Sequence, residues 1–155
     1  MNWGDLCQYG REQSPIDLSD MQENSMLSLD LQGYKDWSAQ VKNLGTTWQV
    51  NFEDSQPDAM MTLVRGDGEV SFWKPLQFHF HAPSEHTIGG RQMDLEVHFV
   101  HLTPEGGLGA VLGVFFDREE GGNYHNDFLD SLILENLPKQ EEEKKEEEKR
   151  DSGEQ

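Results

Sequence analysis

The sequence predicts a mostly β protein with an antiparallel sheet and few short helices. Segments that alternate apolar and polar residues, rich in aromatic and β-branched side chains, recur along the chain and are bounded by Gly, Pro or Asp. Only one segment repeats its apolar residues at the 3.6-residue spacing of a helix. A chain of 155 residues is also long enough for one domain with a modest core.

Six segments are expected to form strands. The first, TWQVNFE, alternates its side chains strictly, as a strand with one buried face does. The next two, MMTLVR and EVSFW, are short apolar and β-branched runs separated by a Gly-Asp-Gly turn signal. The full set of expected strands is 47–53, 60–65, 69–73, 76–81, 93–101 and 108–116.

The single expected helix is HNDFLDSLILENL at 125–137, where Asn126 or Asp127 can cap the first turn and Pro138 ends the helix. Its apolar face consists of Phe128, Leu129, Leu132, Ile133 and Leu137. Residues 139–155 contain no apolar side chain, so we expect a disordered tail or a solvated helix with i,i+4 ion pairs. The chain therefore divides into a folded part at 1–138 and a charged tail at 139–155.

The charge balance argues against nucleic acids and membranes as partners. There are 30 acidic and 12 basic residues, and the resulting formal net charge of -18 repels phosphate backbones and anionic lipid head groups. The sequence has no run of 18 apolar residues, and its start lacks the basic and apolar regions of a signal peptide. One cysteine, Cys7, leaves no internal disulfide possible.

The most informative stretch is QFHFHAPSEHT, which holds two histidines in a strand pattern. Residues i and i+2 of a strand project to the same face about 6.8 Å apart, so His79 and His81 lie side by side. Phe78 and Phe80 then face the opposite, core side. Gln77 shares the histidine face.

The next strand can complete a metal site. In MDLEVHFVH, Glu96, His98 and Val100 share one face and His101 lies on the other. If the hairpin register places His98 opposite the first two histidines, three imidazoles converge, which is the ligand set of a catalytic zinc site with one open position. Gln77 and Glu96 each lie two residues from a histidine on the same face, where they can accept a hydrogen bond from its second nitrogen.

An H-x-H pair on a strand is also compatible with a plain solvated face. Five of the six histidines, however, fall between residues 79 and 101, together with the two possible acceptors. This clustering raises zinc to an even alternative with the solvated face, and the spacing alone leaves both open. The sixth histidine, His125, is expected to have no role.

Four motifs in order resemble a known family. They are WG...YGREQSPIDL at 3–18, QFHFHAPSEHTIGG at 77–90, LEVHFVH at 95–101 and GAVLGVFF at 109–116. Over about residues 3–138 the chain resembles the alpha class of carbonic anhydrases, and its short HAPSEHT connection is more similar to the bacterial and plant branch. The resemblance implies an antiparallel-rich central sheet, a zinc cofactor, and a lyase that reversibly hydrates CO2 to bicarbonate and a proton by zinc-bound hydroxide.

The resemblance also implies roles for individual residues. These are zinc binding for His79, His81 and His98, support of these ligands for Gln77 and Glu96, orientation of a gating hydroxyl for Glu85, lining of the carbon dioxide pocket for Val100 and Val111, and structural roles for His86 and His101. The position of the family's proton-shuttle histidine is Thr46 here, so no shuttle is expected and turnover should depend on buffer.

Two further departures concern the end of the chain. The family continues past a segment like NLP into strands with a Ser-Leu-Thr-Thr-Pro-Pro motif, whose threonine bonds the carboxylate that matches Glu85. Here ENLP is followed by the charged tail. Cys7 resembles a cysteine that, in the bacterial and plant branch, forms a disulfide with one just after that motif. Such a disulfide is expected in secreted or lumenal proteins, so the resemblance implies a secreted or lumenal ancestry. We therefore expect the C-terminal strands to be missing, through a truncated gene model, a short isoform or a fragment that assembles with a partner.

Two functions stay open at this point. The three retained histidines favour a zinc-dependent carbonic anhydrase, with CO2 and bicarbonate as its small-molecule partners. The missing segment favours a catalytically weak or inactive zinc-binding or assembly module. An incomplete sheet would also favour self-association or a partner chain that covers it. The sequence assigns no cellular location.

Overall fold

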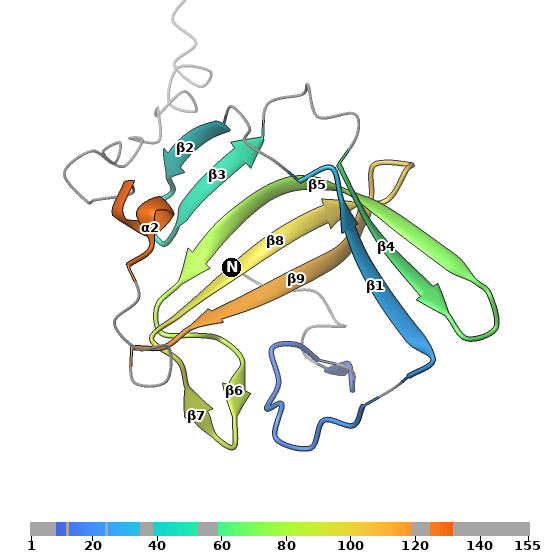
Figure 1. The fold of residues 1–155 in the computed structure, drawn as a ribbon. Coiled ribbons are helices and arrows are strands. Elements are labelled where there is room, and N and C mark those ends of the chain that lie inside the picture. Colours follow the sequence, from blue (N-terminus) through green and yellow to red (C-terminus); the bar gives the residue numbers. More distant parts are fainter. Residues whose placement is uncertain are drawn as a thin grey trace, which may run out of the picture.

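Strands make up most of the chain that the computed structural model describes, which is residues 9–11, 13–23, 25–34, 39–52, 59–118 and 125–131. The strands are β1 (Leu27–Gln32), β2 (Ala39–Asn43), β3 (Trp48–Phe52), β4 (Met60–Arg65), β5 (Val70–His81), β6 (Thr87–Ile88), β7 (Arg91–Gln92), β8 (Leu95–Leu102) and β9 (Leu108–Phe116), and the helix is α2 (Asp127–Ser131). All pairings between these strands are antiparallel, so the predicted fold class is confirmed (Figure 1).

Seven of the strands form one sheet. Its path is β1-β4-β5-β3-β2, and off this path β8 pairs with β5 and β9 pairs with β8. Figure 1 shows β5, β8 and β9 side by side in the middle of the molecule, while β6 and β7 form a separate small hairpin. Because β5 pairs with both β3 and β8, it is paired on both edges as far as His79, and the β8 pairing continues to His81.

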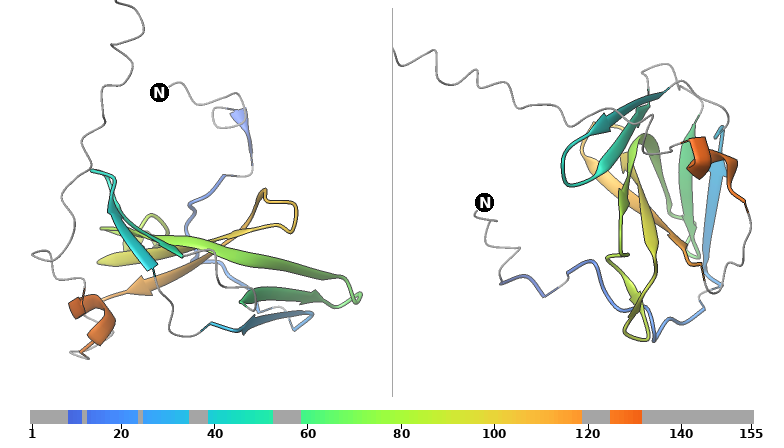
Figure 2. Two further views of the ribbon diagram at one scale, coloured as in Figure 1. Left: turned by 90° about the horizontal axis from the view of Figure 1, so that it is seen from above. Right: turned by 90° about the vertical axis from the view of Figure 1, so that its left-hand side faces the viewer.

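The longest strand, β5, replaces two strands that the sequence predicted at 69–73 and 76–81. It runs for 12 residues through Pro75, which has no backbone N–H for the ladder. The register against β8 shifts between Pro75 and Gln77, so a bulge accommodates the proline and the strand bends without breaking. Figure 2 shows β5 extending along the sheet in one long strand.

The core lies on the sheet face opposite the histidines. Val50, Phe78 and Val97, from three neighbouring strands, are 4%, 6% and 3% exposed, and each such side chain contributes roughly 1.5–3 kcal/mol on burial. The hydrophobics packed against them are Val41, Phe52, Phe80, Leu95, Phe99 and Phe116. The expectation that Phe78 and Phe80 face the core is confirmed.

Some strands were not predicted from the sequence. In β1, LSLDLQ alternates perfectly, yet all six residues are exposed. This strand exists through its pairing with β4 rather than through a buried face. The hairpin strands β6 and β7 have two residues each, so an alternation of apolar and polar residues cannot be recognised in them.

The predicted helix begins where expected. The Asn126 side chain accepts a hydrogen bond from the backbone N–H of Leu129 at 3.0 Å, which confirms it as the cap. The helix is confirmed over Asp127–Ser131. Its continuation to 137, the charged tail and Cys7 lie outside the described residues. No helix in the described part is long and apolar enough to cross a membrane.

An N-terminal segment is fastened to the β6–β7 hairpin. The Asp17 carboxylate accepts the N–H groups of Gly89 and Gly90 at 2.9 and 2.8 Å, where the turn has positive φ. Beside it, Leu18 donates its N–H to the carbonyl of Thr87 at 2.8 Å. The N-terminal segment therefore fixes the loop that follows β5.

Candidate metal centre

Three histidines from two neighbouring strands face one another. The register pairs His79 on β5 directly with His98 on β8, as the sequence required for convergence. The ring centroid of His81 lies 4.9 Å from that of His79 and 4.6 Å from that of His98, and the third separation is 5.5 Å. One potential ligand nitrogen from each ring lies within 4.8 Å of the others.

Neighbouring acceptors select which nitrogen of two of these rings carries a proton. His79 donates from Nδ1 to Gln77 Oε1 at 3.0 Å, and His98 donates from Nε2 to Glu96 Oε1 at 2.8 Å. Each ring therefore keeps its other nitrogen as a lone-pair donor. An acceptor behind a ligand imidazole is what a metal site needs to fix the tautomer.

The third ring supports the fit of a cation to this site. Nε2 of His81 is buried and has no hydrogen-bond partner, an arrangement that is costly unless something else satisfies the nitrogen. Glu85 Oε2 lies 3.5 Å from this atom and 3.8 Å from Nδ1 of His98. Both distances are too long for hydrogen bonds, yet they show that the two nitrogens face one point.

The electrostatics favour a neutral ring at His79. Burial lowers the pKa of His79, and the neighbouring His81 and His98 lower it further, while the Glu85 carboxylate acts in the opposite direction. A metal ligand must offer an unprotonated nitrogen. The site therefore holds His79 in the required form to lower pH than a free imidazole.

Glu96 accepts hydrogen bonds from several residues behind the three histidines. Its side chain is 1% exposed, and its two oxygens accept the backbone N–H groups of Glu85 and His86 and the ring N–H groups of His86 and His98. Burial alone would raise its pKa, but these hydrogen bonds and the electrostatic effect of the neighbouring His98 lower it to about 2. Glu96 is thus a fixed anion near neutral pH.

A second group of possible ligands lies beside the first. Atoms of His86, Glu96 and His98 also lie within 4.8 Å of one another. Here, however, both imidazoles already donate protons to Glu96 Oε1, at 2.7 and 2.8 Å. The polar atoms of this group satisfy one another, so we interpret it as support for His98 and not as a second metal site.

The comparison with protein families agrees with this geometry. A family model described as eukaryotic-type carbonic anhydrase matches residues 1–152. The chain belongs to this family. The family resemblance inferred from the sequence motifs is therefore confirmed.

Carbonic anhydrases from bacteria and plants are among its relatives. A carbonic anhydrase of Nostoc sp. (strain PCC 7120) is 38% identical over 124 residues, covering 74% of this chain and 44% of that protein. Alpha carbonic anhydrase 3 of Arabidopsis thaliana is 34% identical over 131 residues, with 82% and 44% covered. The solved Photobacterium profundum alpha-carbonic anhydrase is 35% identical with a TM-score of 0.65, covering 88% of this chain and 57% of that one. The chain thus spans about half the length of these carbonic anhydrases.

The structure also places the remaining residues to which the carbonic anhydrase pattern gave roles. Val100 and Val111 pair across β8 and β9 on the histidine face, but Val100 is 7% exposed and Val111 is 57% exposed. His86 lies against Glu96 and also contacts Ser14 Oγ through Nε2 at 3.1 Å. Thr46 is exposed in the turn between β2 and β3.

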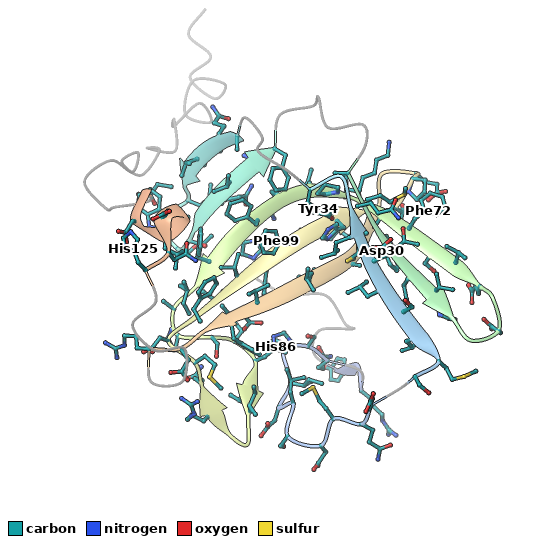
Figure 3. The ribbon with its side chains drawn as sticks, in the orientation of Figure 1. Asp30, Tyr34, Phe72, His86, Phe99 and His125 are labelled. Carbon is teal, nitrogen blue, oxygen red and sulfur yellow. The ribbon has the colours of Figure 1, made fainter. Side chains whose placement is uncertain are left out.

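His101 lies away from the candidate centre, on the other face of the sheet. It is fully buried, its Nδ1 donates to the carbonyl of Phe99 at 2.9 Å, and Nε2 therefore accepts from the Tyr34 hydroxyl at 2.6 Å. Figure 3 labels Tyr34 and Phe99 beside the central strands and His86 near the N-terminal segment. Burial lowers the pKa of His101 and raises that of Tyr34 to about 12, so both stay neutral.

Sequence reasoning missed two residues around the centre. A Cβ at Gly113, which pairs with His98, would lie 2.9 Å from Glu96 Oε1, so only glycine leaves room for that carboxylate. The Thr47 hydroxyl bonds the backbone of Phe80 between the two β5 histidines. Gly113 could have been found from its place opposite a proposed ligand, whereas nothing in the sequence distinguishes Thr47 from Thr46.

Proposed function

We propose that the chain binds one Zn2+ through His79, His81 and His98 and catalyses the reversible hydration of CO2 to bicarbonate and a proton. The observation that carries the proposal is the buried, unsatisfied Nε2 of His81 among three imidazoles. Two of these rings have one nitrogen occupied by an acceptor and the other left free. Three neutral histidines with one open position are typical of catalytic zinc sites.

The residues behind the ligands have a defined part in this chemistry. In carbonic anhydrase, the reference case for such a site, zinc lowers the pKa of water from 15.7 to about 7. Gln77 and Glu96 hold the tautomers that leave Nε2 of His79 and Nδ1 of His98 free. Their hydrogen bonds also fix the ring orientations, so the ligands need little rearrangement when the ion binds.

An apolar wall lies on the same face as the histidines. Val100 and Val111 would hold CO2, which has no charge and no hydrogen-bond donor, next to the reacting water. Glu85, with its side chain 41% exposed and its carboxylate near two of the three rings, is the proposed acceptor that orients that water.

The proton released by CO2 hydration must be transferred from the site to the solvent. No histidine stands at Thr46, whose hydroxyl does not titrate near pH 7, so buffer molecules are the proposed proton acceptors. The expected consequence is a turnover that rises with buffer concentration.

The test combines metal content with activity. The purified chain should take up one equivalent of Zn2+ and accelerate CO2 hydration in stopped-flow measurements with a pH indicator. His98→Ala should lose both, because it removes one ligand of three. The matched control is His125→Ala, whose exposed ring contacts only Asp127 and Asp130 among the described residues. Equal rates in His98→Ala and the unaltered chain would exclude the proposed site.

One observation favours a second function, that of a carbonic anhydrase-like module that binds zinc without turnover. Val111 is 57% exposed, so the described residues alone do not exclude water from the apolar wall. Uptake of one equivalent of zinc without acceleration of CO2 hydration would select this function.

A further inference from the structure

The geometry points to Thr47 as a positioning residue of the metal centre. Its side-chain hydroxyl donates to the carbonyl of Phe80 at 2.6 Å and accepts the N–H of Phe80 at 3.3 Å. Phe80 is the residue between His79 and His81. One hydroxyl therefore holds both backbone polar groups of Phe80, the residue that joins two proposed ligands. This inference rests on the proposed zinc site.

The hydroxyl takes the place of a missing ladder pair. The pairing of β3 with β5 runs from Asn51 opposite Gln77 to Gln49 opposite His79, and it ends there. The next pair in that register would be Trp48 with Phe80. Instead, Thr47 Oγ1 lies between these two residues, 3.3 Å from the Trp48 carbonyl. It supplies the donor and the acceptor that a facing strand residue would have supplied.

The backbone of Thr47 is itself anchored by the turn between β2 and β3. Its carbonyl accepts the N–H of Leu44 at 3.0 Å, and the N–H of Gly45 is held by the Asn43 side chain at 2.9 Å. Gly45 has a φ of 82°, which favours glycine in this turn. The hydroxyl is thus presented to β5 from a closed turn and not from a loose end.

Loss of the hydroxyl would act on the direction of the histidine side chains. On its β8 edge the segment stays paired, with Phe80 opposite Val97 and His81 opposite Glu96. On its β3 edge, Thr47 is the contact that the structure shows at Phe80. Without it the peptide groups on either side of Phe80 can rotate, and the two imidazoles lose their fixed separation. Metal affinity should then fall even though the core face is unchanged.

The decisive comparison is between Thr47→Val and Thr47→Ser. Valine keeps the shape and removes the hydroxyl, whereas serine keeps the hydroxyl. We expect Thr47→Val to raise the Kd for Zn2+, measured by chelator competition, about tenfold, the lower end of the effect of outer residues at metal sites. Thr47→Ser should restore the affinity of the unaltered chain. Thr46→Val, at the exposed neighbour, is the matched control and should change nothing.

A purely structural role would give a different set of results. It would lower the free energy of unfolding of the metal-free chain but leave the Zn2+ affinity and the visible spectrum of the Co2+-substituted protein unchanged, and that outcome would overturn the inference. Amide exchange at Phe80 in the unaltered chain gives a test that needs no variant to fold, because exchange as fast as that of a free amide would also overturn it. Absence of metal uptake by the unaltered chain would instead overturn the proposed function together with this inference.

Discussion

At the level of single residues, Glu96 connects the candidate metal centre to the rest of the protein. It is a buried carboxylate whose four N–H donors come from the loop after β5, from His86 and from the proposed ligand His98. The four N–H groups stabilise the ionised form of this buried carboxylate, and protonation would weaken these hydrogen bonds. The ordering of the loop and the orientation of His98 therefore both depend on Glu96 being ionised.

We predict that this ionisation makes stability depend on pH. The pKa of Glu96 is about 2 in the folded chain against 4.5 for a free side chain, so its contribution is fully present above about pH 4.5 and is lost as pH falls towards 2. The loss should be a few kcal/mol at most, since a difference of one unit between the folded and unfolded pKa corresponds to about 1.4 kcal/mol. Urea unfolding of the metal-free chain between pH 6 and 3 measures it. The same pH dependence in Glu96→Gln would contradict this assignment.

A second prediction concerns Thr46. Thr46→His would place a group that titrates near neutrality at the exposed turn, where it can pass protons between the site and solvent. If the chain hydrates CO2, the variant should turn over severalfold faster in dilute buffer and depend less on buffer concentration. Stopped-flow rates across a buffer series test this. Thr46→Asn, which cannot titrate there, should behave like the unaltered chain.

At the level of elements, a glycine in β9 gives the Glu96 side chain of the neighbouring β8 its space. Glu96 and His98 project from β8 towards the β9 position where Gly113 leaves room. Strand pairing alone fixes the backbones at this spacing, so the room must come from a missing side chain. The sequence GAVLGVFF thus contributes a glycine to the site as well as a strand.

We expect Gly113→Ala to disturb the centre. The added Cβ would lie 2.9 Å from Glu96 Oε1, and that oxygen is held by two imidazoles and cannot move freely. The free energy of unfolding should fall by about 1–3 kcal/mol, with weaker Zn2+ binding. Gly107→Ala is the control, because its Cβ would meet only Thr103 Oγ1 at an ordinary 3.6 Å. Equal effects of the two substitutions in unfolding and Zn2+ titrations would count against a crowded Glu96.

The strand elements also show what a sequence can reveal. Period-2 alternation predicted β3, β4, β8 and β9 closely, and parity put His79 and His81 on one face, since side-chain direction in a strand is local. That His98 joins them depended on the hairpin register, which the sequence could give only as a condition. The continuity of β5 through Pro75 was not predictable, because the bulge depends on its pairing with β8. Thr47 was missed for the same reason, since its partner is 33 residues away.

At the level of the whole molecule, the dominant feature is charge. A formal net charge of -18 makes the folded state repel itself more than the expanded chain does. Few described cations offset it, and some ion pairs, such as Arg118 with Asp94, lie at the surface where they contribute little.

Stability should therefore rise with ionic strength. Between about 10 mM and 0.15 M salt the Debye length falls from about 30 Å to about 8 Å, which screens repulsion across the molecule. Thermal unfolding in a NaCl series should show an increasing Tm, and KCl should give the same increase because screening does not depend on the cation. A flat series, or one specific to a cation, would show that repulsion is not what limits the fold.

The attachment of the N-terminal segment to the β6–β7 hairpin has a practical consequence. Asp17 accepts hydrogen bonds from the turn at Gly89 and Gly90. Ser14 contacts His86, and the same imidazole donates a hydrogen bond to Glu96. A protease that removed the residues before Met21 would cut nothing within the sheet. It would nevertheless release the loop carrying Glu85 from these contacts. If the chain binds Zn2+ as proposed, the cleaved protein should lose the ion to a chelator sooner than the intact one.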